Sequence, residues 1–142
     1  FPKKVFFESN ENENVINLIG SHNGYLKNYY KICKREISIY KKINLIKGQD
    51  TIISTKTIFD KNVYHIRFHL MPNLSATITK NEKSIIIKTK KNNIWLFKSN
   101  SKLSIENSIF VENDTTKESR QIVISGITSG IKNKISWTLE KI

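Results

Sequence analysis

The sequence has few of the residues that cross-link or interrupt a small fold. Its single cysteine, Cys33, rules out an internal disulfide, so the fold does not depend on an oxidising compartment. Pro2 and Pro72 are the only prolines, so nearly every strand can donate all of its ladder hydrogen bonds. No apolar run approaches the roughly 18 residues of a membrane-spanning helix. These shortages exclude a disulfide scaffold and a helical membrane protein.

The motifs of several enzyme classes are missing as well. The sequence contains no HExxH, no CxxC, no GxSxG and no glycine-rich phosphate loop. No pair among the 12 acidic residues suggests a glycosidase couple, and no sequence neighbour marks Cys33 as a nucleophile. The residues alone therefore indicate none of these chemistries.

Basic residues outnumber acidic ones by 24 to 12, which gives the 142-residue chain a net charge of +12. Such a charge favours polyanions: nucleic acid, anionic lipid or acidic polysaccharide. Only "KTKKNN" (88–93) and "YKK" (40–42) look clustered, and the bias towards Lys, Ile and Asn is what AT-rich coding would produce. A nucleic-acid arm would usually show a denser basic run, so nucleic acid is the less favoured partner.

Alternation with a period of two residues dominates the chain. Segments such as "REISIY" (35–40) and "KISWTLEKI" (134–142) place apolar residues on one face, and β-branched and aromatic residues are frequent. Turn signals separate such segments, among them "KGQD" (47–50) and "ENDTTKE" (112–118). We predict ten to twelve short strands in an all-β fold, with antiparallel stacked sheets forming a β-sandwich, as a single domain over residues 1–142.

The segment "VYHIRFHLMP" (63–72) raises the question of a site. It places Tyr64, Ile66, Phe68 and Leu70 on one face of a strand, and His65, Arg67 and His69 on the other. Side chains two residues apart on a strand stand about 6.6–7 Å from each other, too far for adjacent histidines to close a zinc site alone. The row suits an anion-binding strip, with Arg67 facing a carboxylate or sulfate, or else a solvated strand face.

The segment "SHNGY" (21–25) holds the third histidine. It follows an apolar run and ends near Gly24, which suits a tight turn. His22 at such a strand end could be a base, a ligand or a donor to a carboxylate, and the alternative is a histidine in a solvated turn.

Eight segments in order resemble one family. They are "SHNGY", "CKREISI", "IKGQD", "RFHLMP", "NIWLFKS", "LSIENSIFV", "SRQIVISG" and "ISWTLEKI". Their order and spacing are similar to those of the C-terminal β-domain of heparinase II/III-like proteins. That family typically reads Ser-His-Asp-Gly-Tyr, His-Arg-Arg-x-Leu-x-Leu, Leu-x-Gly-Glu-Asp and Arg-Phe-His-Leu-His-Pro. The resemblance runs from Val15 to the end of the chain.

The resemblance implies candidate site residues. His22 and Tyr25 are the catalytic candidates, and Arg35, Arg67 and His69 are the substrate-binding candidates. The chain also departs from the family at four motif positions. Asn23 replaces Asp, Cys33 and Met71 each stand where the family has His, and Lys34 stands where it has Arg.

The function implied by the resemblance is that of a polysaccharide lyase. The family has an N-terminal α-helical toroid followed by stacked antiparallel β-sheets, and its chemistry is β-elimination at uronic acids in glycans such as heparin or heparan sulfate. The toroid supplies most of the catalytic Tyr and His residues. We therefore expect this chain to be the C-terminal part of a larger protein. Its expected partners are an acidic polysaccharide and the toroid of the same parent, and residues 1–142 alone should be inactive.

We expect no cofactor and no metal site in this chain, while a structural divalent metal in the full-length parent is left open. The resemblance implies a periplasmic or cell-envelope location. Because positions 33 and 71 lack the family's histidines, a non-catalytic carbohydrate-binding or scaffold module is an alternative to the lyase. Because the chain is strongly basic, a nucleic-acid-binding domain is a further alternative.

Overall fold

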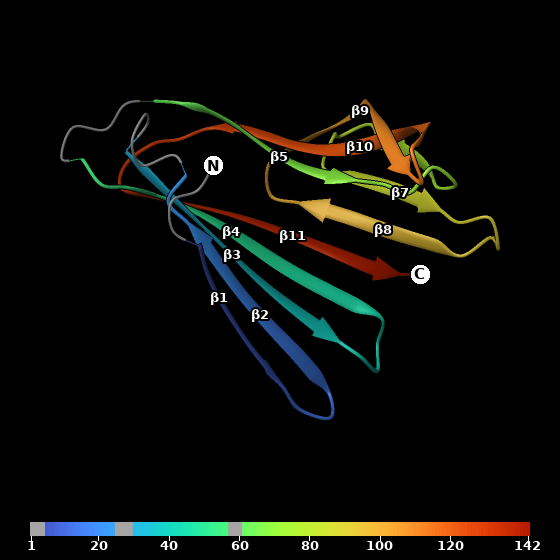
Figure 1. The fold of residues 1–142 in the computed structure, drawn as a ribbon, viewed down its shortest axis with the longest axis horizontal. Helices are drawn as coiled ribbons and strands as arrows, with labels where there is room; N and C mark the ends of the chain where they lie inside the picture. The colour runs from blue at the N-terminus through green and yellow to red at the C-terminus, as the bar shows by residue number, and fades with distance from the viewer. Residues whose placement is uncertain (1–4, 25–29, 57–60) are drawn as a thin grey trace. The chain divides into compact units, whose positions relative to one another are not determined.

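The structure is a computed structural model that describes residues 5–24, 30–56 and 61–142. Its strands are β1 (Val5–Glu11), β2 (Val15–His22), β3 (Lys31–Tyr40), β4 (Leu45–Ser54), β5 (Val63–His69), β6 (Ser75–Ile78), β7 (Ser84–Lys88), β8 (Ile94–Ser99), β9 (Lys102–Glu112), β10 (Thr115–Ile127) and β11 (Lys132–Lys141). Figure 1 shows their course. Among the described residues there is no helix, so none is long and apolar enough to cross a membrane.

The strands form two antiparallel sheets, which confirms the predicted all-β class. One sheet has the order β1-β2-β3-β4-β11-β8-β7-β6, and the other has the order β5-β10-β9. The chain divides into two compact units. Unit 1 comprises residues 1–63 and 127–138, and unit 2 comprises residues 64–126 and 139–142.

Unit 1 is built on a meander of four strands, β1 to β4, in which each strand pairs with the next. Two of the connections are short: residues 12–14 join β1 to β2, and residues 41–44 join β3 to β4. Asn12 shapes the first turn, because its side-chain oxygen accepts hydrogen bonds from the backbone N–H groups of Asn14 and Val15. Neighbouring strands therefore place residues distant in sequence directly opposite one another.

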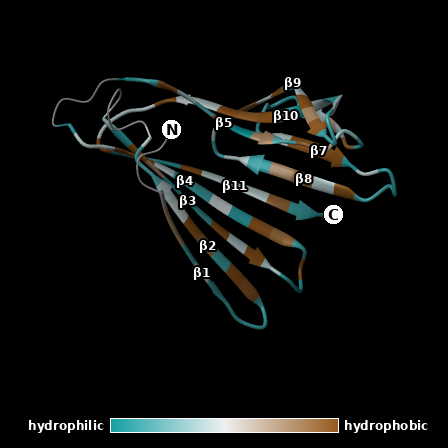
Figure 2. Cartoon of the chain, in the orientation of Figure 1, coloured by the Kyte–Doolittle hydropathy of each residue, from teal (hydrophilic) through white to brown (hydrophobic). Residues whose placement is uncertain are grey.

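Unit 2 holds most of the buried apolar side chains. They are Ile85, Ile87, Phe97, Leu103, Ile122, Val123 and Ile124. Phe68 of β5 packs on Phe97 of β8 with ring centroids 5.2 Å apart, so side chains of the two sheets meet in this core. Along β5, His65, Arg67 and His69 are exposed while Tyr64, Ile66 and Phe68 are half-buried, as the alternation predicts. Figure 2 shows hydrophobic and hydrophilic residues interspersed along the strands.

One predicted turn is wrong, and a second is shorter than its sequence signal. The segment "KGQD" (47–50) lies inside β4, and the segment "ENDTTKE" (112–118) contains only a tight turn, because β9 runs to Glu112 and β10 starts at Thr115. Asn113 and Asp114 take positive φ angles of 50° and 61°, which is the conformation of a two-residue hairpin turn. Residue types that favour turns misled the first prediction, since Gly48 serves a packing role within its strand.

Candidate functional site

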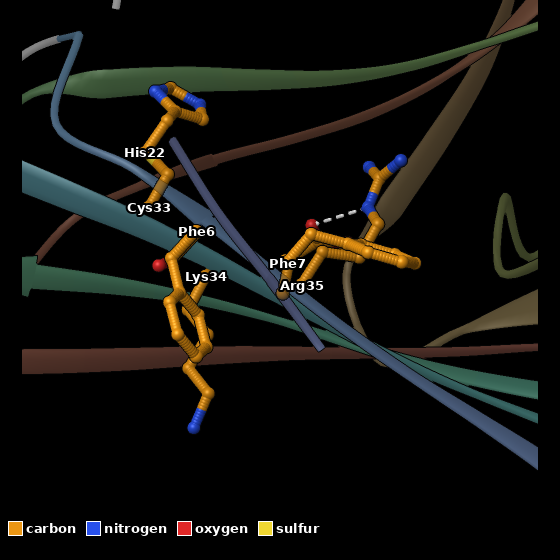
Figure 3. A pocket seen from close by; sticks show the side chains of 9 residues that line it. Phe6, Phe7, His22, Cys33, Lys34 and Arg35 are labelled. Carbon is orange, nitrogen blue, oxygen red and sulfur yellow. Dashed lines mark hydrogen bonds and ion pairs between the residues drawn. The ribbon is translucent and has the colours of Figure 1, made fainter. Parts of the chain in front are cut away.

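Residues of the strands β1 to β4 line an open hollow in unit 1 (Figure 3). Its volume is about 430 Å³. Its lining residues are Phe6, Phe7, Gly20, Ser21, His22, Cys33, Lys34, Arg35 and Asp50. Two of the predicted site residues, His22 and Arg35, therefore lie at the same site.

Strand register explains the shape of the hollow. Phe7 lies opposite Gly20, Gly20 opposite Arg35, and Arg35 opposite Asp50. A Cβ added at Gly20 would find no atom nearer than 3.9 Å, so this glycine leaves open space between the side chains of Phe7 and Arg35. The hollow exists because one position in this row has no side chain.

The pleat separates the lining residues onto two sides. His22 lies opposite Cys33, two residues along from the row that holds Arg35, so these side chains share one face of the sheet. Figure 3 shows His22 and Arg35 pointing one way, and Phe6 and Lys34 pointing the other way. The face with His22 and Arg35 thus offers two side chains with N–H donors and one aromatic ring, that of Phe7.

Arg35 is fixed by a carboxylate that is itself fixed. The Nε atom of Arg35 donates to Oδ1 of Asp50 at 2.8 Å, and the indole Nε1 of Trp137 donates to Oδ2 of the same carboxylate at 2.9 Å. The side chain of Asp50 is 14% exposed and Trp137 is 6% exposed. With both carboxylate oxygens engaged, the guanidinium is held in one orientation beside the hollow. We call Arg35, Asp50 and Trp137 the brace.

Gly48 makes the brace possible. A Cβ at this position would lie 2.1 Å from Cε2 and Cζ2 of Trp137, so the indole ring rests directly on the backbone of β4. Sequence reasoning missed Gly48, Asp50 and Trp137 as site residues. A glycine inside an alternating apolar segment is the signal that could have found them, because it marks a close approach of another group.

His22 is oriented by the turn that follows it. The backbone N–H of Gly24 donates to its Nδ1 atom at 3.2 Å. Since Nδ1 accepts this bond, the neutral ring carries its proton on Nε2. His22 is then a hydrogen-bond donor in its neutral as well as its charged form, which suits contact with an anionic oxygen better than removal of a proton.

Cys33 faces the hollow beside His22. Burial raises the pKa of its thiol, and the negative charge of Asp50 raises it further. The thiol therefore stays protonated at neutral pH, whereas the nucleophilic form of cysteine is the thiolate. The position that carries histidine in the resembled motif is here a neutral, weakly polar group.

The other predicted site residues lie elsewhere. Arg67 and His69 belong to unit 2 and do not line the hollow. On the outer face of the three-stranded sheet, Arg67 pairs with Glu106 and Nδ1 of His69 lies 2.8 Å from the hydroxyl of Ser108. His65 lies 3.0 Å from the hydroxyl of Ser125 in the same way. Their role in substrate binding stays a prediction.

Tyr25 lies outside the described residues, so the structure does not place this catalytic candidate. Within the described part of the chain, no group of three or more His, Cys, Asp or Glu side chains is arranged to hold a metal ion.

Comparison with known protein families shows which family the chain belongs to. Residues 1–138 match the model of the family described as heparinase II/III-like, C-terminal. The chain belongs to this family. The prediction made from the eight sequence segments is therefore confirmed. No curated protein matches the chain by sequence.

Solved structures of lyases share the fold of this heparinase II/III-like chain. Heparan sulfate lyase HepC from Pedobacter heparinus superposes with a TM-score of 0.81 at 10% identity, covering 97% of this chain and 22% of that one. One heparinase III superposes with a TM-score of 0.78 at 6% identity, covering 98% of this chain and 22% of that one. Another superposes with a TM-score of 0.76 at 11% identity, covering 97% of this chain and 21% of that one. At such identities the likeness concerns the fold, and the chain spans about a fifth of these proteins.

The brace joins three of the segments that resemble the heparinase II/III-like family. Arg35 comes from "CKREISI", Gly48 and Asp50 from "IKGQD", and Trp137 from "ISWTLEKI". These segments lie on three different strands, and their shared feature is contact with one carboxylate. A structural reason for part of the motif set is therefore the fixing of Arg35 at the edge of the hollow.

Proposed function

We propose that this chain is the C-terminal β-sandwich domain of a polysaccharide lyase that acts on acidic, uronate-containing glycans. The observation that carries the proposal is the family match over residues 1–138. Solved structures with the same fold are a heparan sulfate lyase and heparinases, and each is several times longer than this chain. The remainder of the parent protein, including an α-helical toroid, belongs to the proposal.

The proposed reaction is β-elimination. A base removes the proton on C5 of the uronate, a double bond forms between C4 and C5, and the bond from C4 to the glycosidic oxygen breaks. An acid protonates the departing oxygen, so the products are an unsaturated uronate and a new hydroxyl group. Charge develops on the uronate carboxylate during proton removal, and neutralising this charge lowers the barrier.

The hollow in unit 1 suits the task of neutralisation. Arg35 carries a permanent charge and is oriented by Asp50, and His22 offers an N–H donor on Nε2. In this proposal both side chains contact anionic oxygens of the glycan from one side of the cleft. The base and the acid come mainly from the toroid of the parent, so the isolated chain should not turn over substrate.

The test uses the full protein and residues 1–142 side by side. Each is incubated with heparan sulfate, heparin and other uronate-containing polysaccharides, and the ultraviolet absorbance of the unsaturated product is followed. The full protein should produce it and residues 1–142 should not. A folded full protein that gives no unsaturated product from any of these glycans would overturn the lyase proposal. Turnover by residues 1–142 would overturn the division of catalytic groups.

One observation favours a second candidate, a non-catalytic carbohydrate-binding or scaffold module. Cys33, whose raised thiol pKa keeps it neutral, stands where the resembled motif has a histidine. A parent that kept the fold but lost its chemistry would tolerate this change. The variant His22→Ala in the full protein separates the two candidates. A large loss of turnover in this variant supports a lyase with His22 at its active site. A full protein that binds glycan without turnover, and whose binding is unchanged in the variant, supports the non-catalytic module.

A further inference from the structure

Half of the chain's net charge lies in one short stretch. Residues 75–102 contain seven lysines and one glutamate, a net charge of +6 out of the +12 of all 142 residues. All seven lysines are exposed. The lysines of this protein are therefore less evenly spread than the sequence first suggests.

Residues 75–99 form β6, β7, β8 and the turns between them, which lie in unit 2, whereas Lys102 is the first residue of β9. Figure 1 shows β7 and β8. On the inner side, Ile85, Ile87 and Phe97 are buried. By alternation, Ile86 and Lys88 of β7 and Leu96 and Lys98 of β8 point outward, and the strand pairing places Ile86 opposite Leu96. We call this outward side of β7 and β8 the lysine face. Its two ends are the turns that carry Lys80 and Lys83, and Lys90 and Lys91.

The lysine face has little negative charge of its own. Strands β6, β7 and β8 contain no Asp or Glu, and Glu82 is the only acidic residue between Asp60 and Glu106. Glu82 lies 3.4 Å from Lys102, at the start of β9. Within the described residues, neither Lys88 nor Lys98 has a carboxylate at ion-pair distance.

The rest of unit 2 has the opposite balance. The segment 103–126, which holds most of the β9–β10 hairpin, carries four acidic residues and two basic ones. A compositional drift towards lysine would act on both parts alike. The separation of charge within one unit instead indicates a surface that attracts an anionic partner.

We propose that the lysine face is a second binding surface for acidic polysaccharide, separate from the hollow. The choice of ligand rests on the proposed function. Lys88 and Lys98 are offset by four residues along the strand pair, about 13 Å, which suits a linear chain with repeated anionic groups. Ile86 and Leu96 lie between the two lysines and contact the apolar C–H surface of the sugar rings.

The geometry favours polysaccharide over the other polyanions. Single-stranded nucleic acid needs exposed aromatic platforms for its bases, and Trp95 and Phe97 of β8 lie on the inner side. Membrane insertion needs apolar groups that project from the surface, whereas Ile86 lies in the middle of a strand. Such a surface would hold the glycan near the protein between turnovers.

The experiment measures binding of heparin to residues 1–142 by calorimetry at several salt concentrations. The double variant Lys88→Gln/Lys98→Gln is compared with Lys42→Gln/Lys117→Gln, which removes the same charge from two exposed lysines outside the lysine face. The first variant should raise the Kd for heparin about tenfold and flatten its salt dependence, and the control should change the Kd less than about twofold. Equal effects of the two variants would overturn the proposal. Thermal unfolding of each variant checks that the fold is kept.

Two further arms separate the ligand classes and the two proposals. Binding of single-stranded DNA or of vesicles with anionic lipid, as tight as that of heparin and equally dependent on Lys88 and Lys98, would overturn the choice of polysaccharide. If heparin binding depends on the lysine face but the parent makes no unsaturated product, the proposal for the lysine face holds and the lyase proposal fails. If the parent is active but the variant Lys88→Gln/Lys98→Gln binds heparin normally, the lyase proposal holds and the proposal for the lysine face fails.

Discussion

The two units of this chain use the same packing device with different consequences. In unit 1, the ring of Trp137 lies on Gly48, where a Cβ would be 2.1 Å from the ring; in unit 2, Tyr64 lies on Gly126, where a Cβ would be 2.3 Å from the phenol oxygen. The polar atom of each ring then finds a partner. Tyr64 reaches the hydroxyl of Ser101, whereas Trp137 donates to Asp50 and through it fixes Arg35. Only the device in unit 1 connects a buried ring to a charged group at a hollow.

The arginine pairs of the two units differ in the same sense. The two arginines are similarly exposed, Arg35 at 38% and Arg67 at 40%, but the carboxylate of Asp50 is 14% exposed whereas that of Glu106 is 47% exposed. An exposed pair contributes about 0–1 kcal/mol because water and salt screen it. A partly buried carboxylate with two fixed donors stabilises an orientation more strongly. The orientation of Arg35 is therefore set by a partly buried carboxylate, whereas that of Arg67 depends on an exposed ion pair.

The largest expected effect is that of removing the Trp137 ring. Trp137→Ala should lower the free energy of unfolding by about 3–5 kcal/mol, since it leaves a cavity and an unpaired oxygen on Asp50. Tyr64→Ala, at a half-buried ring, should cost less, about 1–3 kcal/mol. Urea unfolding measures both. The variant Trp137→Phe keeps an aromatic ring but not the N–H group, so it isolates the contribution of the hydrogen bond. If Trp137→Ala costs no more stability than Tyr64→Ala, the two units do not differ in this respect.

Adding a methyl group at the strand glycines comes next. Gly48→Ala should destabilise the chain by about 1–3 kcal/mol because Trp137 must move away from β4. Gly20→Ala is the matched control, since its Cβ would meet nothing nearer than 3.9 Å. Thermal unfolding compares the two variants. Equal stability of both would show that the indole ring does not rest on Gly48.

The two arginines provide a finer test. Arg35→Gln should lower the free energy of unfolding by about 1–2 kcal/mol, because it leaves the carboxylate of Asp50 without its charged donor. Arg67→Gln should cost less than about 0.5 kcal/mol, since both partners are exposed. The same urea series measures both costs. A larger cost for Arg67→Gln would reverse the comparison.

The smallest effect concerns Cys33 at alkaline pH. Its thiol pKa is raised in the folded chain, so the folded state holds the proton more tightly than the unfolded state does. The resulting stabilisation is present below the ordinary thiol value of 9.0 and is lost as the pH rises through the folded pKa. The stability of the natural chain relative to Cys33→Ser should therefore fall as the pH is raised past about 9. A constant difference would show that the thiol beside Asp50 is well solvated.

The sequence predicted the fold class because period-two alternation survives in nearly every strand. It also identified His22 and Arg35, which meet at the hollow although 13 residues separate them. It could not reveal the brace, because Asp50 and Trp137 stand 87 residues apart and "KGQD" has the composition of a turn. Strand register brings these residues together, and the register of non-adjacent segments cannot be read from local pattern.

In the proposed lyase, Arg35 is held by the brace and contacts an anionic group of the substrate. The most direct measurement compares kcat/KM on heparan sulfate for the full protein with Arg35→Gln and with the exposed charge control Lys42→Gln. We predict that Arg35→Gln lowers kcat/KM about 10- to 100-fold, the worth of a charge-assisted hydrogen bond, while the control stays close to the natural protein. Equal kcat/KM for the two variants would contradict this account.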